Sequence, residues 1–242
     1  MQWRRLRLNW SYAVGELLIV IAGVLIALAI GEWNSARLER HEERAAVARI
    51  LQDLAQDVAD FDFKLDRLAA KEESLLRVRD VLMLGAVGDP AGFLQDVIIG
   101  ADFGWNQGGA MAAAYTDLLG AGRLGIIRNA DVRLSVSRYY EYLAGELPRM
   151  DERETAYPQL SYALVPRQYQ DPEPFLVEER ILERGLTQGE MEAIAAAVLR
   201  SDLGNYVIAE INLARFIRGI TVDSKDRALE LIERLEAYRQ SL

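Results

Sequence analysis

The sequence predicts an all-α protein in which a single N-terminal transmembrane helix continues into a long stalk helix, followed by a periplasmic helical bundle. Three observations support this prediction. Residues 13–31 are apolar except for one glutamate and contain no proline. Residues 33–84 contain neither glycine nor proline and repeat apolar side chains at helical spacing. The remaining chain carries helix caps and further amphipathic stretches.

The amino-acid composition excludes several kinds of functional site. The chain has 242 residues, of which 27% are charged and 51% hydrophobic, as in a globular protein. It has no cysteine, which excludes a disulfide framework, a thiolate metal site and a cysteine nucleophile. The single histidine, His41, lies in a highly charged run and is expected on the surface. We therefore expect no metal, no cofactor and no enzymatic activity.

The net charge of −9 is unevenly divided. The charged residues of positions 1–32 are Arg4, Arg5, Arg7, Glu16 and Glu32, so residues 33–242 carry a net charge of −10. An acidic domain without a basic stripe repels nucleic acid, which we exclude as a partner.

The apolar segment divides the chain into a basic cytoplasmic N-terminus (1–12), a transmembrane helix (13–32), a long stalk helix (33–84) and a helical periplasmic domain (85–242). Tyr12 and Trp33 mark the two membrane interfaces, and the 21 steps between them span roughly 31 Å as a helix. The arginines before the span predict that the N-terminus lies in the cytoplasm and that the domain lies on the other side of the membrane.

A cleaved signal peptide is the rival interpretation of the same segment, with Ala27-Leu28-Ala29 as the cleavage motif. The length of the apolar run, the glutamate within it and its unbroken continuation into helix-forming sequence disfavour cleavage. We therefore retain the membrane span.

Five residues of the span are predicted to contact another membrane helix. Gly23, Ala27 and Gly31 recur every four residues, and such a small-residue face lets helices approach closely. Gly15 and Glu16 lie close to the same stripe. Because a carboxyl group within the membrane is costly, Glu16 is either a proton or ion site, or an acid that snorkels to the nearby interface or hydrogen-bonds a neighbouring chain.

The stalk predicts a coiled-coil seam. Its apolar residues recur at alternating steps of four and three, as heptad a and d positions do: Val47, Leu51, Leu54, Val58, Phe61, Leu65 and Leu68. Four acidic residues off this seam are expected on a solvated face, with a cation site as the alternative: Asp53, Asp57, Asp60 and Asp66. Gly85 and Pro90 mark the end of the helix.

Residues 108–143 contain a glycine motif in the wrong context. Gly120, Gly122 and Gly125 match the dinucleotide-binding pattern, but an alanine-rich helix precedes them where that motif requires a strand. We instead predict a helix closed by glycine, a tight turn and a new helix starting near Asn129. The buried face of the new helix comprises Val132, Val136, Tyr139 or Tyr140, and Leu143.

Residues 147–175 form a predicted loop that holds five of the six prolines. Tyr157, Tyr162 and Tyr169 are interleaved with these prolines and are predicted partner contacts, because tyrosine favours interfaces. The alternative is a connection strapped over the helical core, with the aromatic residues as pins.

Two further helices are predicted near the C-terminus. The first begins at Thr187, which forms a capping box with Glu190, and runs to residue 219 with a dent near Gly204. Thr221 or Asp223 caps the second, which is amphipathic.

Two stretches resemble a known family. The anchor Tyr12-Ala13-Val14-Gly15-Glu16, followed by Gly23, Ile26-Ala27-Leu28 and Trp33-Asn34, resembles the start of a family of uncharacterised bacterial single-pass inner-membrane proteins whose anchor reads YAxGE…GxxIAL…NWN. A later stretch is similar to an internal segment of that family: Tyr115-Thr116-Asp117-Leu118-Leu119, Gly122, Leu124, Ile127, Asn129 and Tyr139-Tyr140. Asp117 and Ala121 stand where glutamate and serine are usual. The resemblance implies the architecture and no activity.

We expect a membrane-anchored, self-associating periplasmic interaction or scaffold protein, or an accessory subunit of a larger membrane assembly. Its expected partners are the lipid bilayer, further copies of the chain and a larger membrane protein complex. One alternative is a periplasmic ligand-sensing bundle, which the short cytoplasmic segment disfavours. Another is an ion- or proton-coupled subunit that uses Glu16. An enzyme is disfavoured because no titratable residues cluster at catalytic spacing.

Overall fold

The computed structural model describes residues 10–102, 112–151, 153–165 and 186–242, and gives residues 10–17 and 151 by their backbone alone. Within these ranges every regular element is a helix and none is a strand, so the predicted all-α fold is confirmed. The elements are α1 (Trp10–Leu84), α2 (Pro90–Gly100), α3 (Ala113–Gly120), the 3₁₀ helix η2 (Leu124–Ile126), α4 (Ala130–Asp151), α5 (Tyr157–Leu164), α6 (Gln188–Arg200) and α7 (Gly204–Ser241).

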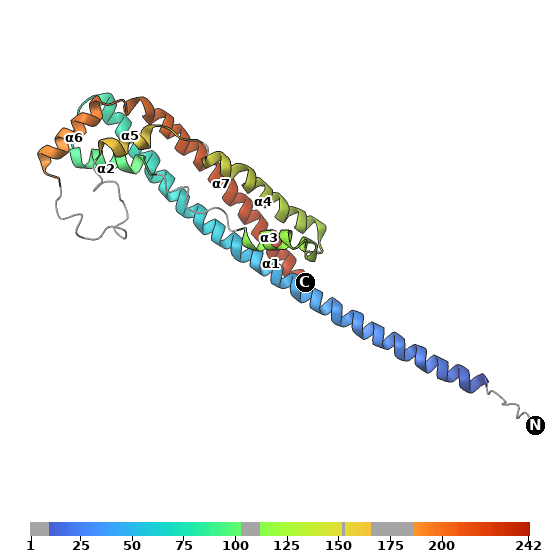
Figure 1. Ribbon diagram of the computed structural model, residues 1–242. Helices are drawn as coiled ribbons and strands as arrows, with labels where there is room; N and C mark the ends of the chain where they lie inside the picture. The colour runs from blue at the N-terminus through green and yellow to red at the C-terminus, as the bar shows by residue number, and fades with distance from the viewer. Residues whose placement is uncertain (1–9, 103–111, 152, 166–185) are drawn as a thin grey trace, which may run out of the picture.

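The first element, α1, is a single helix of 75 residues. Its N-terminal part projects alone, and its C-terminal part forms one side of a folded body (Figure 1). It ends at Leu84, and Gly85 follows with φ 67°, a left-handed conformation that glycine adopts without strain. The apolar segment and the stalk therefore form one continuous helix, as the sequence predicts.

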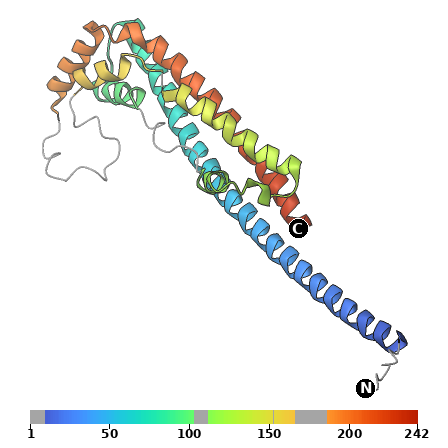
Figure 2. The ribbon, with the colours of Figure 1, turned by 45° about the vertical axis from the view of Figure 1, so that its right-hand side comes forward.

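The body is a helical hairpin with smaller helices laid on it. α7 runs back along α1, so that the C-terminus lies where α1 leaves the body, and α4 lies beside α7 (Figures 1 and 2). α3, η2 and the start of α4 lie near this end of the body, whereas α2, α5 and α6 pack at the far end (Figure 1). Buried apolar clusters fill both ends of the body and the space between them.

The seam between α1 and α7 follows an uninterrupted heptad repeat on both helices. Its positions on α1 alternate steps of four and three, and all of them are buried: Glu43, Val47, Ile50, Leu54, Asp57, Phe61, Lys64, Leu68, Lys71, Leu75 and Val78. The buried positions of α7 repeat in the same way: Val207, Glu210, Ala214, Ile217, Thr221, Ser224, Ala228, Leu231 and Leu235. Charged and hydroxyl side chains therefore lie inside the hairpin.

One row of the predicted seam is correct and the other is wrong. The row that begins at Val47 is buried, whereas Leu51, Val58 and Leu65 are only half-buried beside the seam. The true second row lies one residue earlier and includes Asp57, which the sequence places on a solvated face. The sequence favoured Leu51, Val58 and Leu65 for this row because they are apolar. Charged residues such as Asp57 can be buried only with polar partners, and those partners lie on other helices.

The course of α7 corrects a second prediction. α6 ends at Arg200 and α7 starts at Gly204, so the chain breaks there rather than denting, and no helix begins at Thr221 or Asp223. The Thr221 hydroxyl donates to the carbonyl oxygen of Ile217 (2.9 Å). This bond satisfies the hydroxyl inside the helix, and so the residue that suggested a cap lies in the middle of α7.

Other local signals are confirmed. The Asn129 side chain accepts hydrogen bonds from the backbone N–H groups of Asp131 and Val132, which caps α4. Thr187 and Glu190 form the predicted capping box of α6. The predicted face of α4 is buried throughout: Val132, Val136, Tyr139, Tyr140 and Leu143.

The described part of the predicted 147–175 loop is more helical than expected. α4 continues through Pro148, and Pro158 lies in the first turn of α5. Proline is tolerated in a first turn because the N–H group that it lacks would have no partner within the helix. Residues 166–175, with three of the prolines, lie outside the described residues.

Candidate functional site

The apolar segment of α1 touches nothing else in the described chain. Residues 18–33 are all exposed, and none of the most apolar 18-residue window, with a mean hydropathy of 1.9, is buried. Among the described residues this is the one helix long and apolar enough to cross a membrane by length and composition. It is therefore a candidate membrane span.

The small-residue face lies on this exposed segment. Gly23, Ala27 and Gly31 are exposed, and a Cβ atom added at either glycine would meet nothing within 4 Å. Ser35 continues the four-residue spacing beyond the apolar run. Gly15 and Glu16 are helical, but the Glu16 side chain and the surroundings of Gly15 lie outside what the structure describes.

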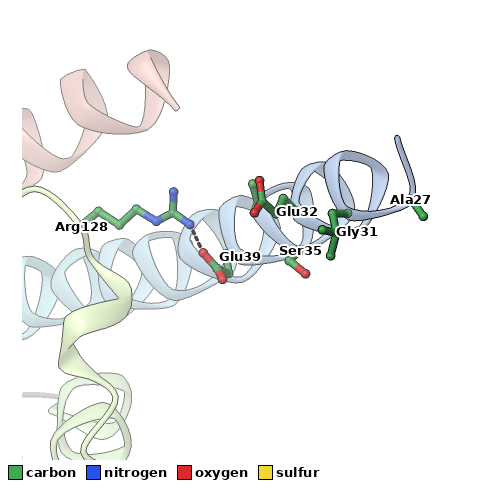
Figure 3. Close-up of a pocket in the computed structure, with 8 residues that line it drawn as sticks. Ala27, Gly31, Glu32, Ser35, Glu39 and Arg128 are labelled. Atoms are coloured by element: carbon green, nitrogen blue, oxygen red, sulfur yellow. Dashed lines mark hydrogen bonds and ion pairs between the residues drawn. The ribbon is translucent and has the colours of Figure 1, made fainter. Parts of the chain in front are cut away.

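A shallow hollow lies where the apolar segment meets the body (Figure 3). One wall is the face of α1 that carries Gly31 and Ser35, and the other is Arg128, from the loop before α4. Arg128 reaches across to pair with Glu39 on α1 (Figure 3). Arg123 forms a second bridge to α1, to Glu42 at 2.6 Å. These bridges tie the η2 region to α1 close to the end of the apolar segment.

Just inside this end, the buried carboxylate of Glu43 joins three segments. Its Oε1 atom accepts hydrogen bonds from the backbone N–H of Arg128 (2.7 Å) and from the Tyr238 hydroxyl near the end of α7. The Tyr238 oxygen in turn accepts from the backbone N–H of Asn129 (3.3 Å). Burial, reinforced by Glu43, raises the pKa of Tyr238. We call this group the Glu43 cluster.

A second buried polar group, the Lys71–Glu210 pair, lies toward the far end of the hairpin. The two side chains form an ion pair with 2% and 0% of their surface exposed. The Lys71 ammonium also donates to the carbonyl oxygen of Asp102 (3.0 Å), and the Thr155 hydroxyl donates to Glu210. Burial lowers the pKa of Lys71, and its pairing with Glu210 opposes that shift.

The two groups fix the same register of the hairpin. Lys71 lies 28 residues after Glu43 on α1, and Tyr238 lies 28 residues after Glu210 on α7, so the separation is four heptads on each helix. Two ion pairs on the flank of the hairpin, Asp62–Lys225 and Glu72–Arg215, are consistent with a constant register. Asp62 and Glu72 are ten residues apart on α1, and Arg215 and Lys225 are ten residues apart on α7. A slip by one heptad would separate both buried groups from their partners.

A tyrosine and aspartate cluster lies between them. The Tyr139 hydroxyl donates to Asp57 (2.9 Å), the rings of Tyr115 and Tyr140 stack with centroids 4.4 Å apart, and Asp53 accepts from the backbone N–H of Ala114 (2.8 Å). Burial raises the pKa of both Tyr139 and Tyr140, and the nearby Asp57 adds to the shift. The described residues contain no group of three or more metal-binding side chains, so the alternative of a cation site gains no support.

The three tyrosines predicted as partner contacts have different positions. Tyr157 is fully buried, and its hydroxyl donates to the carbonyl oxygen of Val97 (3.2 Å). Tyr162 donates to the carbonyl oxygen of Ala101 (3.0 Å) and packs against the far-end core. Both tie α5 to α2 as pins, and Tyr157 has no surface left for a partner. Tyr169 lies outside the described residues.

Sequence reasoning missed the charged residues of the seam. Glu43, Asp57, Lys64 and Lys71 all fall on one unbroken seven-residue repeat, which also contains Ile50 and Val78. This spacing is the signal that could have found them. The contacts of Glu43, Asp57 and Lys71 described above each join two helices, or a helix and a loop.

Comparison with known proteins adds no relative. No protein-family model matches the chain, and neither does any curated protein or any solved structure.

Proposed function

We propose that this chain is a membrane-anchored, self-associating scaffold protein that holds a helical hairpin on a rigid helix outside the cytoplasm. The observation that supports this most strongly is the contrast along α1. Residues 18–33 are apolar and exposed, whereas from Glu43 onward one face of the same helix is buried in the body. Soluble monomers rarely expose so large an apolar surface, and a hydrocarbon layer of about 30 Å would remove it from water.

Rigidity supports the scaffold role. No described helix break separates the apolar segment from the body, and the bridges from Arg123 and Arg128 reach α1 within ten residues of Trp33. The Glu43 cluster and the Lys71–Glu210 pair hold the hairpin in one register. A body fixed in this way keeps a constant position relative to the apolar part of α1, as a platform for other proteins requires.

Self-association is proposed through the membrane helix. The small side chains of Gly23, Ala27 and Gly31 would let a second helix approach closely, and nothing in the described chain covers them. A larger membrane assembly would use the same face or the body.

The decisive test compares two substitutions of the same kind. Ala27→Leu fills the small-residue face, whereas Ala29→Leu places the same side chain about 200° around the helix. Cross-linking of the full-length protein in vesicles should give fewer dimers for Ala27→Leu and wild-type levels for Ala29→Leu. Equal effects of both would contradict this contact, and a pure monomer without co-purifying protein in mild detergent would contradict the scaffold role.

The orientation needs its own measurement. Three arginines precede the span (Arg4, Arg5 and Arg7) and three follow it closely (Arg37, Arg40 and Arg44), so the arginine count favours neither orientation. A reporter fused at the C-terminus should be active only outside the cytoplasm. Cytosolic activity would reverse the proposed topology while leaving the anchor in place.

A further inference from the structure

The anchor-side end of the body differs in charge from the rest. We define this end as residues 33–44, 117–133 and 236–242, which come together where α1 leaves the body (Figures 1 and 2). It has seven arginines and six acidic residues, a net charge of +1, so the remainder of residues 33–242 carries −11. The arginines are Arg37, Arg40, Arg44, Arg123, Arg128, Arg133 and Arg239. One of the acidic residues, Glu43, is buried in its cluster.

This end would lie beside the lipid headgroups. Glu39, which pairs with Arg128, is six residues beyond Trp33, or about 9 Å along the helix; Glu42, which pairs with Arg123, is about 13 Å beyond it. The headgroup layer adds roughly 5–7 Å to each side of the hydrocarbon core. The distance that remains between the headgroup layer and these ion pairs is within the Debye length of about 8 Å at physiological salt. The arginines would therefore be attracted to the lipid phosphates.

The side chains suit phosphate. Arg123 and Arg128 keep 57% and 47% of their side-chain surface exposed, although Arg123 pairs with Glu42 and Arg128 pairs with Glu39 and, at 3.9 Å, with Glu43. A guanidinium group has five N–H donors in a planar fork, so an arginine held by one carboxylate keeps donors for a phosphate oxygen. Leu38 and Leu119 are also exposed at this end and would enter the interfacial layer.

We infer that the anchor-side end is a docking surface for anionic phospholipid headgroups. The inference rests on the proposed membrane anchor and adds a second contact between the protein and the bilayer. Docking would hold the body upright on the bilayer and keep the acidic remainder of the domain, with its charge of −11, farther from the headgroups.

The absence of cysteine makes the test direct. Full-length protein labelled at Ala121→Cys, in the turn before η2, or at Met83→Cys, at the exposed far end, is reconstituted into vesicles of phosphatidylcholine with or without phosphatidylglycerol. A quencher attached to lipid headgroups then reports how close each label lies. Quenching at position 121 should increase with phosphatidylglycerol and lose this increase in 1 M salt, while quenching at position 83 should not respond.

Variants identify the residues. Replacing Arg123 and Arg128 with glutamine should lower the docked-to-undocked ratio roughly five-fold for each arginine removed, whereas replacing Arg215 and Arg218, which pair with Glu72 in mid-body, should not change it. If the glutamine variant fails to fold, the salt dependence of quenching at position 121, in full-length protein with both arginines present, tests the docking by itself. Quenching at position 121 that ignores both phosphatidylglycerol and salt would overturn docking while the anchor stands. Release of the whole protein by alkaline extraction would overturn the anchor itself.

Discussion

Replacing Lys71 with methionine should strongly destabilise the body. Methionine nearly matches the lysine side chain in volume, so the main change is the loss of a positive charge beside Glu210, whose side chain is 0% exposed. Removing one partner of a buried ion pair leaves an uncompensated buried charge and costs about 3–5 kcal/mol. The Asp102 carbonyl oxygen also loses its hydrogen bond. For a domain of this size the loss corresponds to a fall of about 10 °C in Tm.

The assay is thermal unfolding of the full-length protein in mild detergent, followed by far-ultraviolet circular dichroism. Arg215→Met is the matched control, because it breaks another ion pair between the same two helices, to Glu72 at 2.6 Å. That arginine is half exposed, and Arg218 remains 3.8 Å from the carboxylate, so a cost below about 1 kcal/mol is expected.

The double substitution Lys71→Met and Glu210→Leu separates pairing from packing. Because an apolar pair can replace a buried ion pair without loss, the double variant should recover most of the stability lost by Lys71→Met. If Lys71→Met costs no more than Arg215→Met, the pair does not hold the hairpin and the reasoning about its register fails.

Three further outcomes are expected. Burial raises the pKa of Tyr139, Tyr140 and Tyr157 above the ordinary 10.0. Above pH 10 the unfolded chain releases these protons while the folded chain keeps them. The free energy of unfolding should therefore be unaffected by these tyrosines below pH 10. Above pH 10 each of them should lower it by about 1.4 kcal/mol per pH unit. Tyr157→Phe should make this decline shallower, and an unchanged slope in denaturant titrations would refute the assignment. Tyr238→Phe should cost about 1–3 kcal/mol because Glu43 loses a hydrogen bond, whereas Tyr206→Phe, at an exposed position of α7, should change Tm little. Glu16→Gln should leave proton flux across reconstituted vesicles unchanged, and a loss of flux would favour the ion-coupled alternative over the scaffold.

The sequence alone predicted features that depend on neighbouring residues. The continuous helix from the apolar segment through Leu84, its end at Gly85, the caps at Asn129 and Thr187, and the buried face of α4 each follow from residues within a few turns of one another. Local backbone preferences and helical periodicity are sufficient for such features.

Only the tertiary structure decided which charged residues lie inside. Glu43 meets Tyr238 across 195 residues of sequence, and Lys71 meets Glu210 from the opposite helix of the hairpin. A charge is tolerated in a core only when its partner is present, so its place cannot be assigned before the partner helix is known. The same limit explains α7: the Thr221 hydroxyl is satisfied inside the helix, and packing along α1 buries a residue that by itself would suggest a cap.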